Sequence, residues 1–362
     1  MGRKLSSDKF LFTLTIAMMM FGLVMIYSAS AVLAMEKHHN AFYFVERQII
    51  WSAIALVGMF LLMNIPYRKW NNRILVYGSL TAAVSLLILV LFAPSVANVH
   101  RWFRLGPLSL QPAELAKLPL IIFLSYHLAR KQGQIDSFWQ TLLPALLVCG
   151  QMAFLVVMEP DLGTAIMFLG IAMAMLFLAG MPLRYFAGLI VVSLPLFYFL
   201  IMNVGYRRER LFSFFNPEAD ALDKGFQIIQ SLIALGAGGT KGVGLANGIQ
   251  KLFYLPEPHT DFVYAIIGEE LGLIGTVAVL MAFVLFLWRG LRIAWKVPDP
   301  FGQFLAAGIT IMIVLQAFIN ISVVVGLLPT KGLPLPFISS GGSSLLVNLM
   351  GVGILLNISQ HA

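Results

Sequence analysis

A series of long apolar runs, most of them holding roughly 20 residues, constrains the fold of this chain more than any other feature. A helix needs about 20 apolar residues to cross a bilayer, whereas a strand of a membrane barrel needs about 10 in an alternating pattern. The composition agrees, because 59% of the 362 residues are hydrophobic and only 11% are charged. The sequence therefore predicts an all-α polytopic membrane protein.

Ten membrane spans are predicted along the chain. They cover residues 10–35, 48–64, 73–92, 112–130, 139–158, 162–180, 184–204, 262–288, 302–327 and 340–358. Arg3, Lys4 and Lys9 precede the first span, but this apolar run is longer than that of a signal peptide and no clear cleavage site follows it, so we expect a retained helix. The only cysteine, Cys149, falls inside the fifth span, which excludes a disulfide and a cysteine metal site.

The basic residues indicate the orientation of these spans. If the N-terminus is cytoplasmic, the cytoplasmic segments hold half of the 24 Lys and Arg residues but only three of the 16 acids. Because cytoplasmic loops are enriched in Lys and Arg, we expect a single transmembrane domain, residues 1–362, with both termini in the cytoplasm. The net charge of +8 then reflects topology and does not indicate nucleic-acid binding.

One long extracytoplasmic loop, residues 205–261, interrupts the predicted spans, and long loops without a domain of their own tend to be functional. Residues 225–235 have a helical apolar stripe, which predicts a short amphipathic helix along the membrane surface. The glycine-rich segment 236–244 lacks the strand and the Walker spacing of a nucleotide site. Glycine flexibility in a loop over a cavity is the simpler interpretation.

The segment 255–262, Leu-Pro-Glu-Pro-His-Thr-Asp-Phe, brings His259 and Asp261 to the point where the long loop meets an apolar helix. A charge is costly inside a bilayer, but at the rim an acid can meet a lipid-borne substrate while it still contacts water. A helix N-cap formed by Asp261 or Thr260 would explain the same residue types. The spacing alone leaves both interpretations open.

Two more polar clusters fall on the same predicted face. Glu114 and Lys117 share a helix face, so they form either a structural ion pair or, together with Arg101, the charged wall of a cavity that suits phosphate oxygens. Glu159 and Asp161 lie in one tight turn. This turn is either an ordinary solvated turn or a place where a divalent cation, Mg²⁺ or Mn²⁺, bridges the carboxylates and a substrate pyrophosphate.

The segment 328–344 is rich in proline, glycine and serine and lies between two predicted spans. Irregular backbone at membrane depth is tolerated only where it is buried in protein or lines a wet cavity, so this segment predicts a cavity. Ser343 and Ser344 would then lie at a helix N-terminus, which suits anions. A serine nucleophile is not indicated, because the sequence places no base beside it.

Five motifs carry a resemblance to a known family. They are GLVMIYSASAVLA at 22–34, HRWFRLGPLSLQPAELAK at 100–117, MEPDLGTA at 158–165, KLFYLPEPHTDFVYAIIGEELG at 251–272 and PTKGLPLPFISSGGSSLL at 329–346. In this order they resemble the SEDS proteins (shape, elongation, division and sporulation), the peptidoglycan glycosyltransferases that include FtsW, RodA and SpoVE. The FtsW-type division branch is the most similar.

The resemblance implies an enzyme that polymerises lipid II into β-1,4-linked glycan at the outer face of the bacterial cytoplasmic membrane and releases undecaprenyl pyrophosphate. It would act in septal wall synthesis or cell-shape maintenance, with a class B penicillin-binding protein and other divisome or elongasome membrane proteins as partners. Asp261 would be the general base. The implied substrate-binding residues are Arg101, Glu114, Lys117, Glu159, Asp161, Lys241, His259, Lys331 and Ser343.

Two other functions are open to such a chain. A lipid II flippase would need polar groups on both sides of a through-path, and a divisome scaffold would leave the cavity residues without a role. The acids and the irregular backbone lie on the predicted outer face, which favours the polymerase. The sequence requires no cofactor, apart from the divalent cation that Glu159 and Asp161 could hold.

Overall fold

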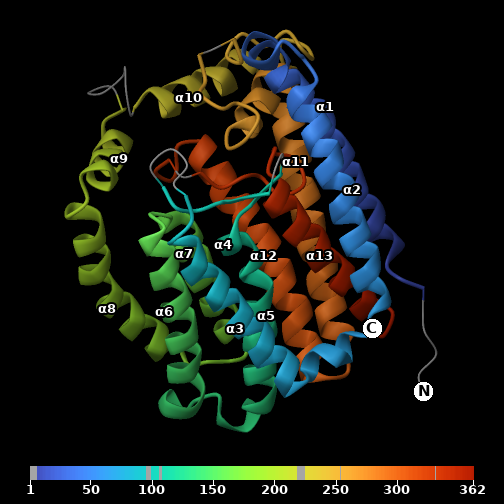
Figure 1. The fold of residues 1–362 in the computed structure, drawn as a ribbon, viewed down its shortest axis with the longest axis vertical. Helices are drawn as coiled ribbons and strands as arrows, with labels where there is room; N and C mark the ends of the chain where they lie inside the picture. Colours follow the sequence, from blue (N-terminus) through green and yellow to red (C-terminus); the bar gives the residue numbers. More distant parts are fainter. Residues whose placement is uncertain (1–5, 95–98, 106–107, 218–224, 253, 331) are drawn as a thin grey trace.

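The protein is a bundle of long helices (Figure 1), and the computed structural model describes residues 6–94, 99–105, 108–217, 225–252, 254–330 and 332–362. The helices are α1 (Lys9–His38), α2 (Tyr43–Asn64), α3 (Arg73–Val90), α4 (Pro112–Leu115), α5 (Lys117–Arg130), α6 (Leu143–Met158), α7 (Leu162–Leu178), α8 (Leu183–Met202), α9 (Gly205–Phe215), α10 (Phe226–Gly238), α11 (Val263–Lys296), α12 (Pro300–Val324) and α13 (Gly342–Ser359). Short 3₁₀ turns, η1 (Tyr67–Asn71) and η2 (Gln132–Gln134), and a π turn, η3 (Phe138–Leu142), join some of them. Strands β1 (Phe103–Leu105) and β2 (Leu108–Leu110) form a small antiparallel hairpin.

Eight helices in the described part of the chain are long and apolar enough to cross a membrane. They are α1, α2, α3, η3 with α6, α8, α11, α12 and α13. The predicted all-α polytopic class is therefore confirmed. The other two predicted spans correspond to α5, which is separated from α4 at Ala116, and to α7, which has 17 residues. The count of ten spans stays a prediction.

Helix α12 lies at the centre of the bundle and packs against α5, α7 and α11, while α13 packs along α2. Small residues allow these close approaches. A Cβ added to Gly308 of α12 would lie 2.6 Å from a methyl carbon of Ile121 and 2.8 Å from the sulfur of Met175. Close backbone approach at small residues is typical of helix packing in membranes, where dispersion contacts drive association.

Helix α8 stands apart from this centre and forms the left edge of the molecule in Figure 1, below α9 and α10. None of its described side chains is buried. Near its start, the Tyr185 hydroxyl donates a hydrogen bond to the Asp136 carbonyl at 2.8 Å, and the Phe186 ring meets that of Phe177. The bundle therefore consists of a tightly packed centre and one loosely attached helix.

The glycine-rich segment 236–244 packs against a break in α11. The backbone of α11 becomes non-helical at Gly272, where φ is 66°. The Gly244 N–H donates to the Glu270 carbonyl at 3.0 Å, and a Cβ at Gly242 would lie 2.1 Å from that same oxygen. The interpretation of this segment as a flexible loop is therefore wrong, because its glycines permit the backbones to touch.

The amphipathic helix predicted at 225–235 is present as α10. It packs against α11 and α12, with Ile228 and Ala234 buried, and the Ser231 hydroxyl donates to the Val324 carbonyl at 2.7 Å. The helix is therefore confirmed, and its apolar side is covered in part by the protein.

The start of α1 and the end of α13 lie close together, at the lower right of Figure 1. The Asp8 N–H donates to the Ser359 hydroxyl at 3.0 Å, and the Asp8 carboxylate pairs with Arg289 at 2.5 Å. The start of α1 and the end of α13 thus share one end of the bundle. The assignment of that end to the cytoplasm stays a prediction.

Candidate active site

Asp261 lies two residues before α11 and is half-buried. No described residue donates a hydrogen bond to that carboxylate. The N-cap of α11 is Phe262, with no side-chain cap, and the Thr260 hydroxyl instead donates to the Glu257 carbonyl at 3.0 Å. The N-cap interpretation of Asp261 and Thr260 is therefore wrong, and the carboxylate of Asp261 is left available for chemistry.

Burial is the largest of the causes that raise the pKa of Asp261 from its usual 3.8 to about 7. The negative charges of Glu257 and Asp161 raise it further, and Arg210 lowers it. Near neutral pH this acid therefore exists in both its protonated and its ionised form, which suits a group that accepts and returns a proton.

A cavity of about 530 Å³ opens next to the loop that carries Asp261, although Asp261 itself is not one of its lining residues. The C-terminal segment contributes to its lining, and a Cβ added to Gly332 of that segment would lie only 3.0 Å from Oδ2 of Asp261. Other lining residues are the charged Arg101, Asp161, Arg207 and Arg210 and the apolar Ile166, Phe197, Ile201 and Leu211. The cavity predicted from the irregular C-terminal segment is thus confirmed. Its lining contains both arginines and apolar side chains.

Two buried amides of α12 hold the loops around this cavity together. The Asn320 amide donates to the Asp261 carbonyl at 2.8 Å and to the Leu333 carbonyl at 2.7 Å. Gln316, one helical turn earlier on the same face, donates to the next carbonyl, that of Pro334, at 2.8 Å. Helix α12 thus fixes the Asp261 loop relative to the C-terminal segment.

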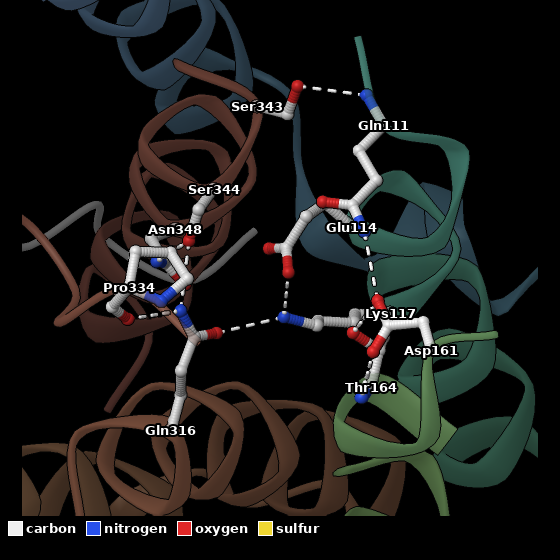
Figure 2. A network of polar contacts seen from close by, with 10 residues as sticks. All are labelled: Gln111, Glu114, Lys117, Asp161, Thr164, Gln316, Pro334, Ser343, Ser344 and Asn348. Atoms are coloured by element: carbon white, nitrogen blue, oxygen red, sulfur yellow. Dashed lines mark hydrogen bonds and ion pairs between the residues drawn. The ribbon is translucent and has the colours of Figure 1, made fainter. Parts of the chain in front are cut away.

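Figure 2 shows how the same face of α12 reaches a buried ion pair. Glu114 and Lys117 pair at 2.6 Å, and the Lys117 ammonium also donates to the Gln316 oxygen at 2.8 Å. Lys117 has no exposed surface, and neither charge belongs to the lining of the cavity described above. The predicted pairing is observed, but the pair is buried in the bundle and takes no part in the cavity lining.

The α6–α7 turn contributes two acids with different roles. Asp161 caps α7 through the Thr164 N–H at 3.0 Å, and its other oxygen accepts from the Thr164 hydroxyl at 2.9 Å and from the Gln111 amide at 3.1 Å. Glu159 is fully buried, and neither carboxylate oxygen has a hydrogen-bond partner among the described residues. Burial and the charge of Asp161 raise the pKa of Glu159 to about 8, although Arg101, which donates to the Glu159 carbonyl at 2.7 Å, opposes this rise.

The predicted Mg²⁺ or Mn²⁺ site at these two acids stays a prediction. Both oxygens of Asp161 already accept hydrogen bonds, whereas both carboxylate oxygens of Glu159 are buried without a partner among the described residues. A Mg²⁺ ion is held by one or two carboxylates together with water and substrate phosphates. Within the described ranges, no three His, Cys, Asp or Glu side chains lie together as metal ligands would.

His259 lies in the same loop as Asp261, and its contacts hold this loop against neighbouring segments. Its side chain is buried, its ring meets the Phe44 ring with centroids 4.2 Å apart, and its carbonyl accepts from the Ser340 N–H at 2.9 Å. Burial lowers the pKa of this imidazole, and the nearby Glu257 opposes that change. His259 thus joins two loops and does not belong to the cavity lining.

The remaining predicted residues lie outside the cavity lining or outside the described residues. The Ser343 hydroxyl donates to the Ser109 carbonyl at 3.1 Å and accepts from the Gln111 N–H at 3.0 Å, so it fastens the β1–β2 hairpin to α13. Lys241 is exposed on the glycine-rich segment. Lys331 lies outside the described residues. A role in substrate binding for these residues stays a prediction.

Sequence reasoning assigned no role to Arg210, Gln316 or Asn320. A signal for Arg210 exists, because Arg207, Arg208 and Arg210 lie in a loop predicted to be outside, where the positive-inside rule expects few cations. Gln316 and Asn320 are polar residues one turn apart inside a predicted span, which is itself unusual.

A second buried network, also unassigned from the sequence, anchors the start of the Asp261 loop. Glu270 pairs with Lys251 at 2.6 Å and accepts from the Ser28 hydroxyl of α1 at 2.7 Å. Glu269 accepts from the Ile249 N–H at 2.7 Å. Two adjacent acids at the start of an apolar span were the available signal, because buried charges need partners.

Comparisons with known proteins identify relatives of this arrangement. The sequence profile of the FtsW, RodA and SpoVE family, described as "Cell cycle protein", matches residues 8–362. The chain is 45% identical to "Probable peptidoglycan glycosyltransferase FtsW" of Geobacter metallireducens, over 98% of this chain and 95% of that one. It is 44% identical to "Stage V sporulation protein E" of Bacillus subtilis, over 99% of each chain.

Solved structures share the fold along almost the whole chain. One comes from work described as "Structural coordination of polymerization and crosslinking by a peptidoglycan synthase complex", with a TM-score of 0.82, 32% identity and 98% of both chains covered. The rod shape determining protein RodA of Thermus thermophilus has a TM-score of 0.73 and 28% identity, with 98% of this chain and 97% of that one covered.

Proposed function

This chain belongs to the FtsW, RodA and SpoVE family of cell cycle proteins, and we propose that the cavity beside Asp261 is the active site of a peptidoglycan glycosyltransferase. The chain is a multi-pass membrane protein, and a relative with this activity in its name matches it over 98% of its length. The substrate is lipid II, a disaccharide-pentapeptide on undecaprenyl pyrophosphate, and the product is a β-1,4-linked glycan strand.

Asp261 is the general base of this reaction. The 4-hydroxyl of the acceptor GlcNAc attacks C1 of the MurNAc at the lipid end of the growing glycan. The hydroxyl proton passes to Asp261, the C1–oxygen bond to the pyrophosphate breaks, and the anomeric centre is inverted. The observation that carries this assignment is the carboxylate of Asp261, which has a pKa of about 7, no donor among the described residues and a cavity beside it. A base with a pKa near the working pH is the most effective.

The leaving pyrophosphate needs charge neutralisation more than protonation. Arg101 and Arg210 line the cavity, and guanidinium groups bind phosphate oxygens through paired hydrogen bonds. The apolar side chains of Phe197, Ile201 and Leu211 on the same wall fit the isoprenoid chain. One carboxylate therefore suffices, whereas glycoside hydrolysis uses two.

The enzyme works in the bacterial cytoplasmic membrane with this cavity facing outward, in septal wall synthesis or cell-shape maintenance. The positions of the basic residues support this orientation. The match to a peptidoglycan synthase complex in which polymerization and crosslinking are coordinated supports a class B penicillin-binding protein as partner. Other divisome or elongasome membrane proteins complete the assembly.

The test is polymerisation of purified lipid II by the purified protein, alone and with its class B partner. Asp261→Ala should abolish glycan synthesis, while Asp136→Ala, which removes an exposed acid, should leave it intact. Both variants should unfold at the temperature of the wild type. Glycan made equally well by Asp261→Ala would overturn the general-base assignment. If the wild type moves lipid II across vesicles but makes no glycan with its partner, the protein is a transporter.

A further inference from the structure

A second pocket, of about 330 Å³, lies at the far end of α11 from Asp261. Three separate parts of the chain form it: the residues that lead into α1, the last two turns of α11, and the end of α13 with the C-terminus. Its lining side chains include four cations and one acid. The full lining is Ser6, Ser7, Asp8, Lys9, Arg289, Arg292, Ile293, Lys296, Ser359 and Ala362.

The cations of this pocket lack enough acids to balance them. Arg289, Arg292 and Lys296 follow one another at intervals of three and four residues, so they share one face of α11. In the described part of the chain, Arg292, Lys296 and Lys9 have no acidic partner within ion-pair distance. Like charges on one helix face repel each other, so an anion in this pocket would relieve the repulsion.

One of these cations is already oriented. The Asp8 carboxylate accepts a hydrogen bond from Nε of Arg289 at 2.5 Å, and Asp8 is itself held in place by the Ser359 hydroxyl and by capping α1. Among the described residues, nothing accepts a hydrogen bond from the two Nη groups of Arg289. An arginine fixed through Nε keeps these groups ready for an anion, which reduces the ordering cost of binding.

Exposed tryptophans lie next to this pocket, as they do at the surface of a membrane. Trp288 and Trp295 flank its arginines on α11, and their side chains are 51% and 75% exposed. The Arg289 and Arg292 guanidinium groups lie 5.9 and 5.5 Å from the Trp288 ring. Exposed tryptophans gather at the level of lipid headgroups, and the chain places these beside α11 residues that lead out of the bilayer.

We propose that this pocket binds the phosphate headgroup of an anionic lipid of the cytoplasmic leaflet, with a phosphatidylglycerol headgroup as the simplest ligand. The arginines and lysines bind the phosphate oxygens, and the hydroxyl of Ser7 forms a hydrogen bond with the glycerol. Basic pockets between transmembrane helices bind anionic headgroups on this principle. The size of the pocket falls at the lower end of small-molecule sites. The site is independent of the glycosyltransferase reaction.

The test is thermal unfolding of the protein in nanodiscs of phosphatidylcholine with increasing phosphatidylglycerol. A lipid that binds only the folded protein raises its melting temperature. The double variant Arg292→Gln, Lys296→Gln keeps the Asp8–Arg289 pair and should bind phosphatidylglycerol about tenfold more weakly or worse. The matched control, Arg130→Gln with Lys131→Gln, removes the same charge outside the pocket and should respond to the lipid as the wild type does.

Each outcome decides the proposal. An equal loss of the lipid response in the pocket variant and in the control would show general attraction to a charged surface and overturn the site. An unchanged response in the pocket variant would overturn it as well. Soluble glycerol phosphate is added in a separate arm with phosphatidylcholine alone. If it stabilises the wild type as strongly as the lipid does, the ligand is a soluble phosphate and not a headgroup.

Discussion

Helices α12 and α8 have the same mean hydropathy over their most apolar 18 residues, yet they occupy opposite environments. Of those residues, 72% are buried inside the protein in α12 and none in α8. Helix α12 turns Gln316 and Asn320 toward the Asp261 loop and the C-terminal segment, while α8 exposes side chains such as Val191 and Tyr198. Apolar character alone therefore does not distinguish a helix that positions a site from one that faces lipid.

The two helices contribute to the candidate site in different ways. The groups that must hold a fixed geometry are hydrogen-bonded to the buried helix, where an unpaired polar atom would be costly. The apolar wall that Phe197 and Ile201 give to the cavity comes from the exposed helix, which has few contacts to hold it. Segments with few buried contacts open at low cost, so substitutions in the two helices should have very different consequences.

The largest expected effect comes from breaking the ion pair that α12 supports. Glu114→Gln leaves the Lys117 ammonium buried without its counter-charge, 2.8 Å from the Gln316 oxygen. Losing one partner of a buried pair costs about 3–5 kcal/mol, which thermal unfolding in detergent should register as a large drop in the melting temperature. Glu46→Gln, the same change at an exposed glutamate, should leave the melting temperature unchanged.

The double variant Glu114→Gln, Lys117→Met sharpens this result. Removing both charges together removes the unpaired charge, so most of the lost stability should return. If the double variant is as unstable as Glu114→Gln, the pair is not the reason for the loss. If its glycan synthesis recovers along with its stability, the pair acts only through folding.

A smaller effect is expected at Asn320, which joins the two loops. Asn320→Leu leaves the Asp261 and Leu333 carbonyls without their donor and should cost about 1–3 kcal/mol of stability. Polymerisation should lose kcat more than KM, because the base is displaced while the cavity persists. Asn64→Leu, at an exposed asparagine of α2, serves as the control. Equal and normal activity in both variants would contradict the positioning role.

The last comparison is between one glycine in each helix. Gly308→Ala in α12 pushes a methyl against Ile121 and Met175, and such overpacking costs about 1–3 kcal/mol. Gly188→Ala in α8 meets no atom within 4 Å and should stabilise the protein by about 0.4–1 kcal/mol, because alanine favours a helix more than glycine does. Equal melting temperatures for the two variants would mean that α12 and α8 are packed alike.

Much of the helical framework was predictable, because apolar runs of spanning length report directly on helices in a membrane. The predicted 10–35 and 302–327 correspond to α1 and α12 within three residues at each end. The helix predicted at 225–235 corresponds to α10, and the cavity beside the C-terminal segment was also predicted correctly, whereas the long extracytoplasmic loop stays a prediction. The residue type and position of Asp261 singled it out before any contact was known.

The details that were missed depend on contacts between distant parts of the chain. Asn320 and the backbone of Asp261 are 59 residues apart, and no local pattern reports such a hydrogen bond. The break in α11 at Gly272 lies inside an apolar run that predicts one continuous helix. The glycine-rich segment 236–244 forms backbone hydrogen bonds at this break, and no local pattern indicates them. The site residues His259 and Ser343 were identified by motif, but their contacts join loops and helices instead of lining the cavity.

The pH dependence of lipid II polymerisation tests the central claim, that Asp261 is the general base, most directly. Burial raises its pKa to about 7, so the carboxylate is mostly protonated at pH 6 and mostly ionised at pH 8. Only the ionised form accepts the sugar proton, and the initial rate should therefore rise about tenfold between these values with a midpoint near 7. The melting temperature is recorded at each pH as the control for folding. A rate that is constant from pH 6 to 8, or that falls as the pH rises, would contradict the account.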